Sequence, residues 1–290
     1  MSTCRIGVLG ASSLVGDHLI RLLALLGDDD VIAFSRKRRS GDAIYRARWL
    51  ALDHLRDEAM SFDGWICLAP IWVLPDYFEA LERAGVRRVV ALSSTSRFSK
   101  ISSSSAEDRR LAARLADAEQ RIQDWAETRG VQWVILRSTL IYGDGRDRNV
   151  SDIARFLRRW CCFPLIGGSA GLRQPVHAAD VAEFCIRALK HPVATGHAFD
   201  ICGGETLTYR DMVKRIGDAM GISVRFLAVP RPILRGAVRA IACLPRFRSL
   251  SPALIDRLAQ DLVFDGSAAN RLFNVAPRPF VVTPTDLPTV

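Results

Sequence analysis

The chain has 290 residues, of which 49% are hydrophobic, so it can bury the core of one large α/β domain, with or without a small additional lobe. No apolar run reaches the ~18 residues that a membrane-spanning helix needs, and the first apolar run is of strand type rather than a secretory leader, so we expect a cytoplasmic protein. The net charge of +9 favours anionic partners, although arginine spread over solvated faces explains it equally well, and no nucleic-acid-binding module is visible.

The chain begins with the pattern of a strand, a small-residue turn and a helix. Residues 5–9 have the pattern of a buried strand, and apolar residues at helical spacing follow from Leu14. The turn between them has the spacing Gly10-x-x-Ser13-x-x-Gly16, which suits a dinucleotide-phosphate cradle. The first glycine permits a sharp turn, the last permits close packing of helix on strand, and the first N–H groups of the helix face the pyrophosphate.

This turn is not a P-loop, because Asp17 rather than lysine follows Gly16. The alternative to a cofactor site is a glycine turn in an α/β protein that binds no cofactor. We predict that the cofactor is bound here, by Gly10, Ser12, Ser13, Leu14, Val15 and Gly16.

The second expected strand, residues 31–34, ends in a basic run. In NAD-preferring sites an acidic residue at this point binds the ribose 2′-hydroxyl, but here the chain continues Ser35-Arg36-Lys37-Arg38-Arg39. A guanidinium can hold a 2′-phosphate through two hydrogen bonds, whereas a carboxylate would repel it. We therefore predict that Ser35 and Arg36 select NADP(H), with NAD as the alternative; an exposed basic loop is the simpler interpretation of the same run.

Strands and helices alternate through the first half of the chain. The further expected elements are strands over 45–52, 64–68, 89–92 and 133–137, helices over 74–84 and 106–129, and a mobile Ser-rich loop over 99–107. This alternation predicts an α/β fold with a Rossmann-like, doubly wound parallel sheet. Ligands of such sheets bind outside the carboxyl ends of the strands, where this chain has Gly10, Arg36, Ala69, Pro70, Ser93 and Ser94.

Four segments in this order resemble motifs of the extended and atypical short-chain dehydrogenases/reductases. They are the glycine turn (GxxGxxG, with Ser13 for the middle glycine), residues 136–143 (LRPxxxYG, with Ser138 for the proline), residues 175–182, and the closing segment 265–280. The resemblance covers nearly the whole chain. It implies a single domain, with a Rossmann core mainly at 1–143 plus 175–203 and a small C-terminal substrate lobe from about 144–174 and 224–290.

The same resemblance implies a nucleotide-linked substrate, because basic residues of the lobe meet the diphosphate in such enzymes. The corresponding residues here are Arg173 and His177. Asp180, which follows shortly, is expected to be a helix N-cap.

The Tyr-x-x-x-Lys pair that performs proton transfer in this family is missing. The residues four positions after the tyrosines are Trp49, Leu81, Arg146 and Val213. Aligning Glu119 with the glutamate that follows the family's lysine puts Leu111 and Leu115 in place of the pair, and two leucines cannot transfer a proton. Candidate catalytic substitutes are Ser94 and Thr95, at the position of the family's active-site Ser/Thr, and Tyr142; simple packing or solvation is the alternative for each.

Residues 231–248 place apolar side chains on one helical face beside arginines such as Arg235 and Arg239. Such a segment can lie on an anionic membrane surface or meet a lipid-linked substrate, or it can pack on the substrate lobe. The seven cysteines include no CxxC, and the five histidines have no metal-ligand spacing, so we expect neither a disulfide framework nor a metal site.

Two functions remain. The first is an NAD(P)-dependent epimerase, dehydratase or reductase acting on a nucleotide-linked or lipid-linked sugar, a small and anionic substrate. The second is a non-catalytic NADP(H)-binding scaffold or redox sensor, a role taken by regulatory proteins and a respiratory-complex accessory subunit of the same superfamily. The missing pair favours the second function, and the basic residues of the lobe favour the first. The sequence leaves the oligomeric state open.

Overall fold

The computed structural model describes residues 4–27, 30–35, 47–55, 60–165, 171–230, 232, 233, 236 and 258–289. A seven-stranded sheet forms the core, in the order β11-β6-β5-β4-β1-β2-β3, and every neighbouring pair is parallel. Its strands are β1 (Arg5–Leu9), β2 (Asp30–Ser35), β3 (Arg48–Ala51), β4 (Gly64–Cys67), β5 (Arg88–Ser94), β6 (Gln132–Ser138) and β11 (His197–Ile201). The predicted Rossmann-like, doubly wound parallel sheet is confirmed.

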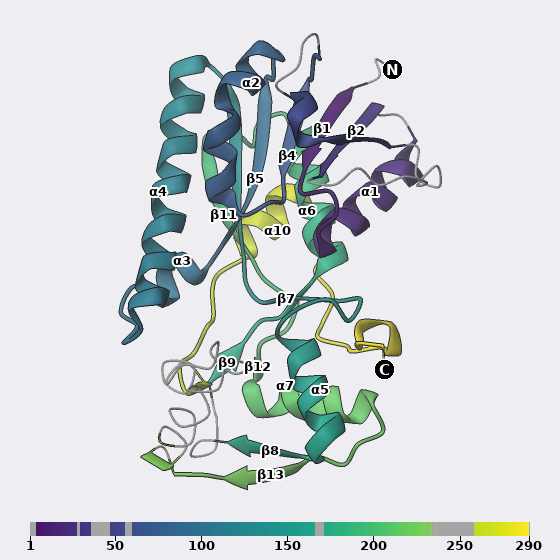
Figure 1. Ribbon diagram of the computed structural model, residues 1–290, viewed down its shortest axis with the longest axis vertical. Coiled ribbons are helices and arrows are strands. Elements are labelled where there is room, and N and C mark those ends of the chain that lie inside the picture. Colours follow the sequence, from purple (N-terminus) through teal and green to yellow (C-terminus); the bar gives the residue numbers. More distant parts are fainter. Residues whose placement is uncertain are drawn as a thin grey trace.

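Helices cover both faces of this sheet, and its central strands β1, β4 and β5 are therefore buried over most of their length (Figure 1). One face packs against α1 (Leu14–Leu26), α6 (Ala178–Lys190) and α10 (Ser267–Phe273). The other packs against η3 (Ile71–Tyr77), α2 (Phe78–Arg83) and α4 (Ala106–Arg129). Two short helices, η2 (Leu52–Leu55) and α3 (Ser96–Ser99), follow β3 and β5.

Helix α4 has the bounds that the sequence predicts. The Ser105 hydroxyl accepts from the Asp108 N–H at its start, and Gly130 ends it in the left-handed conformation at φ 67°. The Ser-rich stretch before it is held by contacts to α4, because Ser103 donates to the Asp108 carboxylate at 3.0 Å and Lys100 pairs with the same group at 2.8 Å.

The helix predicted over 74–84 is only partly correct. The α-helical part begins at Phe78, and a 3₁₀ segment from Ile71 to Tyr77 precedes it. Pro75 lies inside that segment. Proline has no N–H to donate and its ring obstructs the carbonyl four residues earlier, so the chain takes tighter turns until it is past this residue.

The smaller lobe lies below the core in Figure 1 and has its own apolar cluster. Its helices are α5 (Val150–Trp160) and α7 (Tyr209–Ala219). Three two-stranded pairs accompany them: β7 (Ile141–Tyr142) with β10 (Val176–His177), β9 (Leu172–Arg173) with β12 (Leu207–Thr208), and β8 (Cys162–Leu165) with β13 (Arg225–Ala228). The final helical turn, η5 (Pro284–Asp286), follows the closing segment.

Thr208 is the N-cap of α7, and its hydroxyl accepts from the Asp211 N–H at 3.0 Å. The lobe includes α7, which packs in its apolar cluster. The sequence analysis expects the lobe only at about 144–174 and 224–290, and α7 lies between these ranges. By contrast α10, which lies within those ranges, packs on the core sheet through Ala269 and Phe273. The closing segment therefore runs from core to lobe.

Asp180 is not a helix N-cap, which corrects the sequence prediction. His177 occupies that position in α6, and its ring Nδ1 accepts from the Ala179 N–H at 3.1 Å. The Asp180 carboxylate is turned to the closing segment instead, where Arg278 donates to it from its backbone N–H at 3.0 Å and from Nε at 2.9 Å.

The basic stretch 231–248 lies almost wholly outside the described residues, including Arg235 and Arg239. Within the part of the chain that is described, no helix is both long and apolar enough to cross a bilayer.

Candidate functional site

The order of the strands reverses between β1 and β4, which defines a switch point at the carboxyl ends of these two strands. The glycine turn follows β1 at this point and contacts the chain that leaves β4. Gly10 has φ +82°, and a Cβ added there would come within 2.5 Å of the Ala69 backbone nitrogen. An added Cβ at Gly16 would come within 2.3 Å of the Ala11 carbonyl oxygen. Only glycine fits at these two positions, because the Cβ of any other residue would collide with neighbouring backbone atoms.

The start of α1 is built as an anion site. Ser13 is its N-cap, and its hydroxyl accepts from the Gly16 N–H at 3.1 Å. The amides of Leu14 and Val15 open the helix and have no acceptor within it, so they can donate to an oxygen of an anion bound at the turn. Replacing the family's middle glycine by Ser13 thus supplies a cap, and the turn keeps its shape.

Arg146 is a residue of this site that the sequence analysis missed. It comes from the loop between β7 and α5, and its Nη2 donates to the Ser12 carbonyl at 3.0 Å. Its Nη1 pairs with Asp17 in the first turn of α1. This pairing offsets a carboxylate that would repel a pyrophosphate. No local signal could have indicated it, because 129 positions separate the two partners.

At the end of β2, Ser35 is buried, with 6% of its surface exposed. Arg36 and the rest of the basic run lie outside the described residues, so the choice between NADP(H) and NAD stays a prediction. On the other side of the glycine turn, Ala69 is half-buried and Pro70 is exposed at the carboxyl end of β4.

A buried charge cluster lies beneath the ends of β5 and β6. The Glu119 carboxylate of α4 is fully buried and accepts from Ser93 Oγ at 2.6 Å. Arg137 donates to it from Nε at 3.0 Å and from Nη2 at 2.7 Å, and Arg97 of α3 also pairs with it. Ser93, predicted as a cofactor-binding residue, therefore has a side chain committed to this cluster.

The three proposed catalytic substitutes have different surroundings. The Ser94 hydroxyl is half-buried and accepts from the Ser96 N–H at 3.1 Å, which leaves its own proton to donate. Thr95 is 6% exposed and its hydroxyl donates to the Ser138 carbonyl at 3.2 Å. Tyr142 is 1% exposed, its hydroxyl donates to the Val281 carbonyl at 3.3 Å, and burial raises its pKa to about 12. Ser94 is thus the substitute whose surroundings best suit contact with a substrate oxygen.

Leu111 and Leu115 both pack into the apolar cluster between α4, η3 and the sheet, and Leu115 is 3% exposed. Their neighbour Arg114 turns to η3, where its guanidinium lies 4.3 Å from the centre of the Trp72 ring. The helix face that carries the family's proton-transferring pair is thus packed with hydrocarbon at these two positions.

The two basic residues assigned to the substrate diphosphate are buried and bonded within the protein. Arg173 donates from Nη1 to the carbonyls of Leu172 and Gln260, each at 2.7 Å. His177 accepts at Nδ1 as the α6 cap, and its Nε2 lies 3.1 Å from Asp286 Oδ1. With both ring nitrogens engaged, His177 ties the η5 turn, which follows the closing segment, to the start of α6.

A second histidine lies beside this pair and joins the two lobes. The rings of His18, on α1, and His177 meet edge to face with centres 5.4 Å apart. His18 Nε2 is 3.1 Å from an Asp144 carboxylate oxygen. Burial lowers the pKa of His18 and outweighs the attraction of Asp144, so the ring is held neutral near pH 7.

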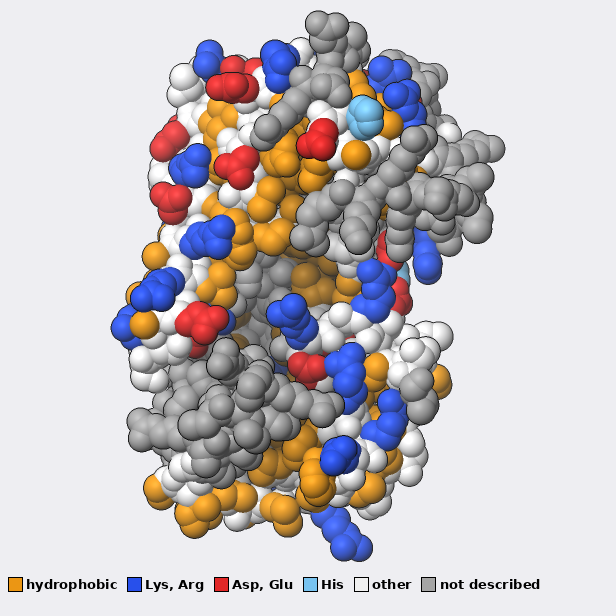
Figure 2. Space-filling view, viewed as in Figure 1, with side chains coloured by type: hydrophobic (Ala, Val, Ile, Leu, Met, Phe, Trp, Pro, Cys, Tyr) orange, Lys and Arg blue, Asp and Glu red, His pale blue; other side chains and the backbone are white. Residues whose placement is uncertain are grey.

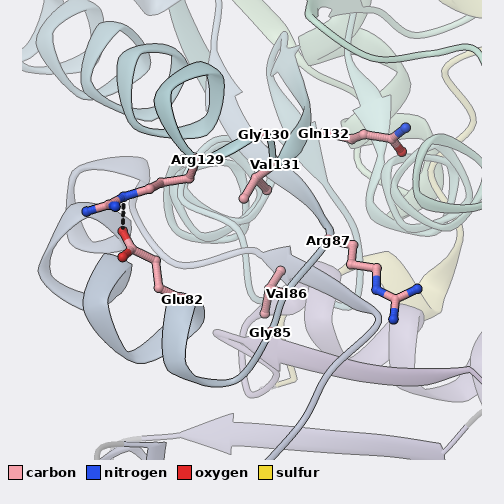
Figure 3. A pocket seen from close by; sticks show the side chains of 8 residues that line it. All are labelled: Glu82, Gly85, Val86, Arg87, Arg129, Gly130, Val131 and Gln132. Carbon is pink, nitrogen blue, oxygen red and sulfur yellow. Dashed lines mark ion pairs between the residues drawn. The ribbon is translucent and has the colours of Figure 1, made fainter.

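A hollow of about 560 Å³ lies away from this site (Figure 3). It is lined by residues that precede β5 and β6, at the amino ends of the strands. The ion pair between Glu82 and Arg129, at 3.1 Å, spans one side, and Arg87 points away from it (Figure 3). Its location at the amino end of a parallel sheet excludes it as the dinucleotide site. Among the described residues, no three His, Cys, Asp or Glu side chains gather as a metal site would require.

The parallel sheet with its switch point and the glycine turn define a Rossmann-like fold. The model of the NAD-dependent epimerase/dehydratase family matches residues 76–202. The match covers 127 of the 290 residues, which is less than half of the chain.

The similar proteins include both enzymes and a respiratory subunit. The chain is 23% identical over 115 residues to a UDP-glucose 4-epimerase of Vibrio cholerae, which covers 40% of this chain and 35% of that protein. It is 26% identical over 157 residues to the mitochondrial NADH dehydrogenase [ubiquinone] 1 alpha subcomplex subunit 9 of Arabidopsis thaliana. This alignment covers 54% of this chain and 36% of that protein. The matched parts thus span about a third of each of these relatives.

Among solved structures, the UDP-glucuronic acid 4-epimerase of Bacillus cereus in complex with NAD has a TM-score of 0.68 at 17% identity. The alignment covers 97% of this chain and 95% of that one. At this level of identity the similarity establishes the fold of core and lobe together.

Proposed function

We propose that the protein binds a nicotinamide dinucleotide on the glycine turn and acts on a nucleotide-linked or lipid-linked sugar as an NAD(P)-dependent epimerase, dehydratase or reductase. The observation that carries the proposal is the pair of glycines at the switch point, where a Cβ on either would occupy the space next to the backbone. Such a cradle fits a pyrophosphate. UDP-sugar epimerases among the similar proteins support this substrate class.

In this proposal some residues bind the cofactor and others contact the substrate. The amides of Leu14 and Val15 donate to the pyrophosphate, and Arg146 neutralises Asp17 beside it. The nicotinamide, when bound, supplies hydride acceptance and donation at the substrate carbon. The Ser94 hydroxyl donates to the substrate oxygen at the carboxyl end of β5 and stabilises negative charge on it.

A second candidate function is a cofactor-binding scaffold or sensor without turnover. The specific observation in its favour is the packing of Leu111 and Leu115 in the apolar cluster of α4, together with the buried, high-pKa hydroxyl of Tyr142. The likeness to an NADH dehydrogenase subunit supports it. Both functions share the same dinucleotide site.

Stopped-flow measurement of NADPH absorbance with a panel of 4-keto nucleotide sugars separates the two. Without a proton-transferring pair, which contributes roughly 10²–10⁴-fold in rate, we expect slow reduction. We expect Ser94→Ala to lower this rate by roughly 10²-fold, the scale for one oxyanion donor, with cofactor affinity unchanged. Tyr142→Phe is the control, and we expect it to leave the rate unaltered. A rate indifferent to Ser94→Ala would place the chemistry elsewhere, and no turnover with intact cofactor binding would support the scaffold.

The preference for NADP(H) is tested by calorimetry. We expect NADPH to bind more tightly than NADH, and Arg36→Ala to narrow the difference by roughly 1–3 kcal/mol, because one charge-assisted hydrogen-bonding partner of the 2′-phosphate is lost. Arg48→Ala is the matched control, since Arg48 is exposed at the amino end of β3, away from the ligand edge. Equal affinities in the unaltered protein would contradict the prediction and favour NAD.

A further inference from the structure

The end of the small lobe exposes large apolar side chains to solvent. This surface, which we call the lobe tip, consists of the C-terminal half of α5 and the β8–β13 pair. Phe156 and Trp160 on α5 are 37% and 56% exposed, and Leu227 on β13 is 50% exposed. In Figure 2 hydrophobic side chains gather at the lower end of the molecule, where Figure 1 places β8 and β13.

The helix and the strands of the lobe tip pack against one another. Phe156 and Trp160 are four residues apart and share a helix face. The Phe156 ring contacts the Phe163 ring of β8, with centres 5.5 Å apart. Phe163 is the register partner of Phe226, and Leu227, the next residue of β13, faces the opposite side of the strand pair. Helix and strands therefore hold the exposed side chains in fixed relative positions.

The charge around the lobe tip is of one sign. The elements of the tip, residues 156–165 and 225–228, contain the arginines Arg158, Arg159 and Arg225 and no acidic residue. At the tip itself the Arg159 guanidinium lies 5.2 Å from the centre of the Trp160 ring, and Arg225 is exposed at the start of β13. The tip thus combines exposed hydrocarbon with uncompensated positive charge.

This combination determines what the tip can bind. A second copy of the tip would present like charges and be repelled. A nucleic acid would meet the arginines but would leave aliphatic side chains such as Leu227 without a partner. An anionic bilayer satisfies both features, because tryptophan rings lie at the headgroup level, aliphatic side chains enter the acyl boundary and arginines meet lipid phosphates.

We propose that the lobe tip is a docking surface for an anionic phospholipid membrane, with Trp160 and Leu227 inserted at the interface and Arg159 and Arg225 on the headgroups. The core then faces away from the bilayer, because the tip lies at the opposite end of the lobe from the sheet (Figure 1). This docking does not depend on the proposed function, since the tip shares no residue with the dinucleotide site.

The test is sedimentation of the full chain with vesicles of phosphatidylcholine alone or with about one third phosphatidylglycerol, at low and high salt. We expect binding to the anionic vesicles that weakens as salt rises. Trp160→Ser and Arg159→Glu should each weaken it roughly tenfold, through lost apolar burial and through charge reversal respectively. Trp160 is the most exposed of the six tryptophans, so its fluorescence should shift to the blue and be quenched by brominated lipid.

Leu227→Ser and Leu25→Ser form a matched pair, because Leu25 is 84% exposed on α1 of the core. We expect only Leu227→Ser to weaken vesicle binding, and both to keep the fold and the cofactor affinity, since both side chains are exposed. No binding to anionic vesicles, equal binding to neutral ones, or equal effects of the two leucine variants would overturn the proposal. Salt-sensitive retention on RNA without vesicle binding would also overturn it and assign the charge to nucleic acid.

Discussion

Gly10→Ala should remove a large part of the stability of this protein and abolish binding of the dinucleotide. The backbone at Gly10 has φ +82°, a region that costs an L-residue roughly 1–2 kcal/mol. In addition the new Cβ would lie 2.5 Å from the Ala69 nitrogen and 2.8 Å from the Leu68 carbonyl carbon. Both are backbone atoms of the neighbouring strand end and cannot rotate away. We expect a total loss of about 3–5 kcal/mol in the free energy of unfolding.

A matched glycine separates the two causes. Gly85 has φ +65°, and no described atom lies within 4 Å of its added Cβ. Gly85→Ala should therefore show only the cost of the left-handed backbone, about 1–2 kcal/mol, with dinucleotide affinity intact. Urea unfolding and calorimetric titration with NADH and NADPH measure both quantities. Equal losses of unfolding free energy in Gly10→Ala and Gly85→Ala would contradict the close approach of the backbone after β1 to the backbone after β4.

Glu119→Gln should be the most destabilising conservative substitution in the core. The carboxylate is fully buried and satisfies Ser93 Oγ, Arg97 and Arg137 together. Neutralising it leaves two guanidiniums, whose side chains are only 27% and 15% exposed, without their counter-charge. Breaking one partner of a buried ionic network costs about 3–5 kcal/mol, and the partial exposure of the arginines places our expectation near the lower limit.

The control for this experiment is an ion pair on the surface. Asp152 and Arg155 pair at 2.6 Å on α5 with both side chains more than half exposed. Asp152→Asn should cost less than about 1 kcal/mol, because water screens and replaces such a pair. Adding Arg97→Gln to Glu119→Gln should recover part of the lost stability, since one unpaired charge is removed. Equal effects of Glu119→Gln and Asp152→Asn in urea unfolding would show that the cluster contributes no more than a surface pair.

The local sequence determined the elements that position the glycine turn. Alternating apolar runs predict a parallel sheet, and the spacing of Gly10, Ser13 and Gly16 predicts its turn, because both features depend on neighbours in the chain. The bounds of α4 follow from Ser105 and Gly130 for the same reason. Pro75 interrupts the helical spacing of apolar residues, and the α-helix expected there is shorter than predicted because proline cannot donate a backbone hydrogen bond.

Tertiary structure alone decided which side chains are available for chemistry. From the sequence, His177 and Arg173 are both candidates for binding an anionic substrate. In the fold, His177 instead contacts Asp286, and Arg173 donates to the Gln260 carbonyl. Arg146 does the reverse and joins the glycine turn from the far side of the lobe boundary. A hydrogen bond between residues that are separated by many positions depends on how the elements pack, which no local pattern records. The sequence therefore predicts the strand end at which a cofactor would lie, and the packing decides which side chains remain able to act on a substrate beside it.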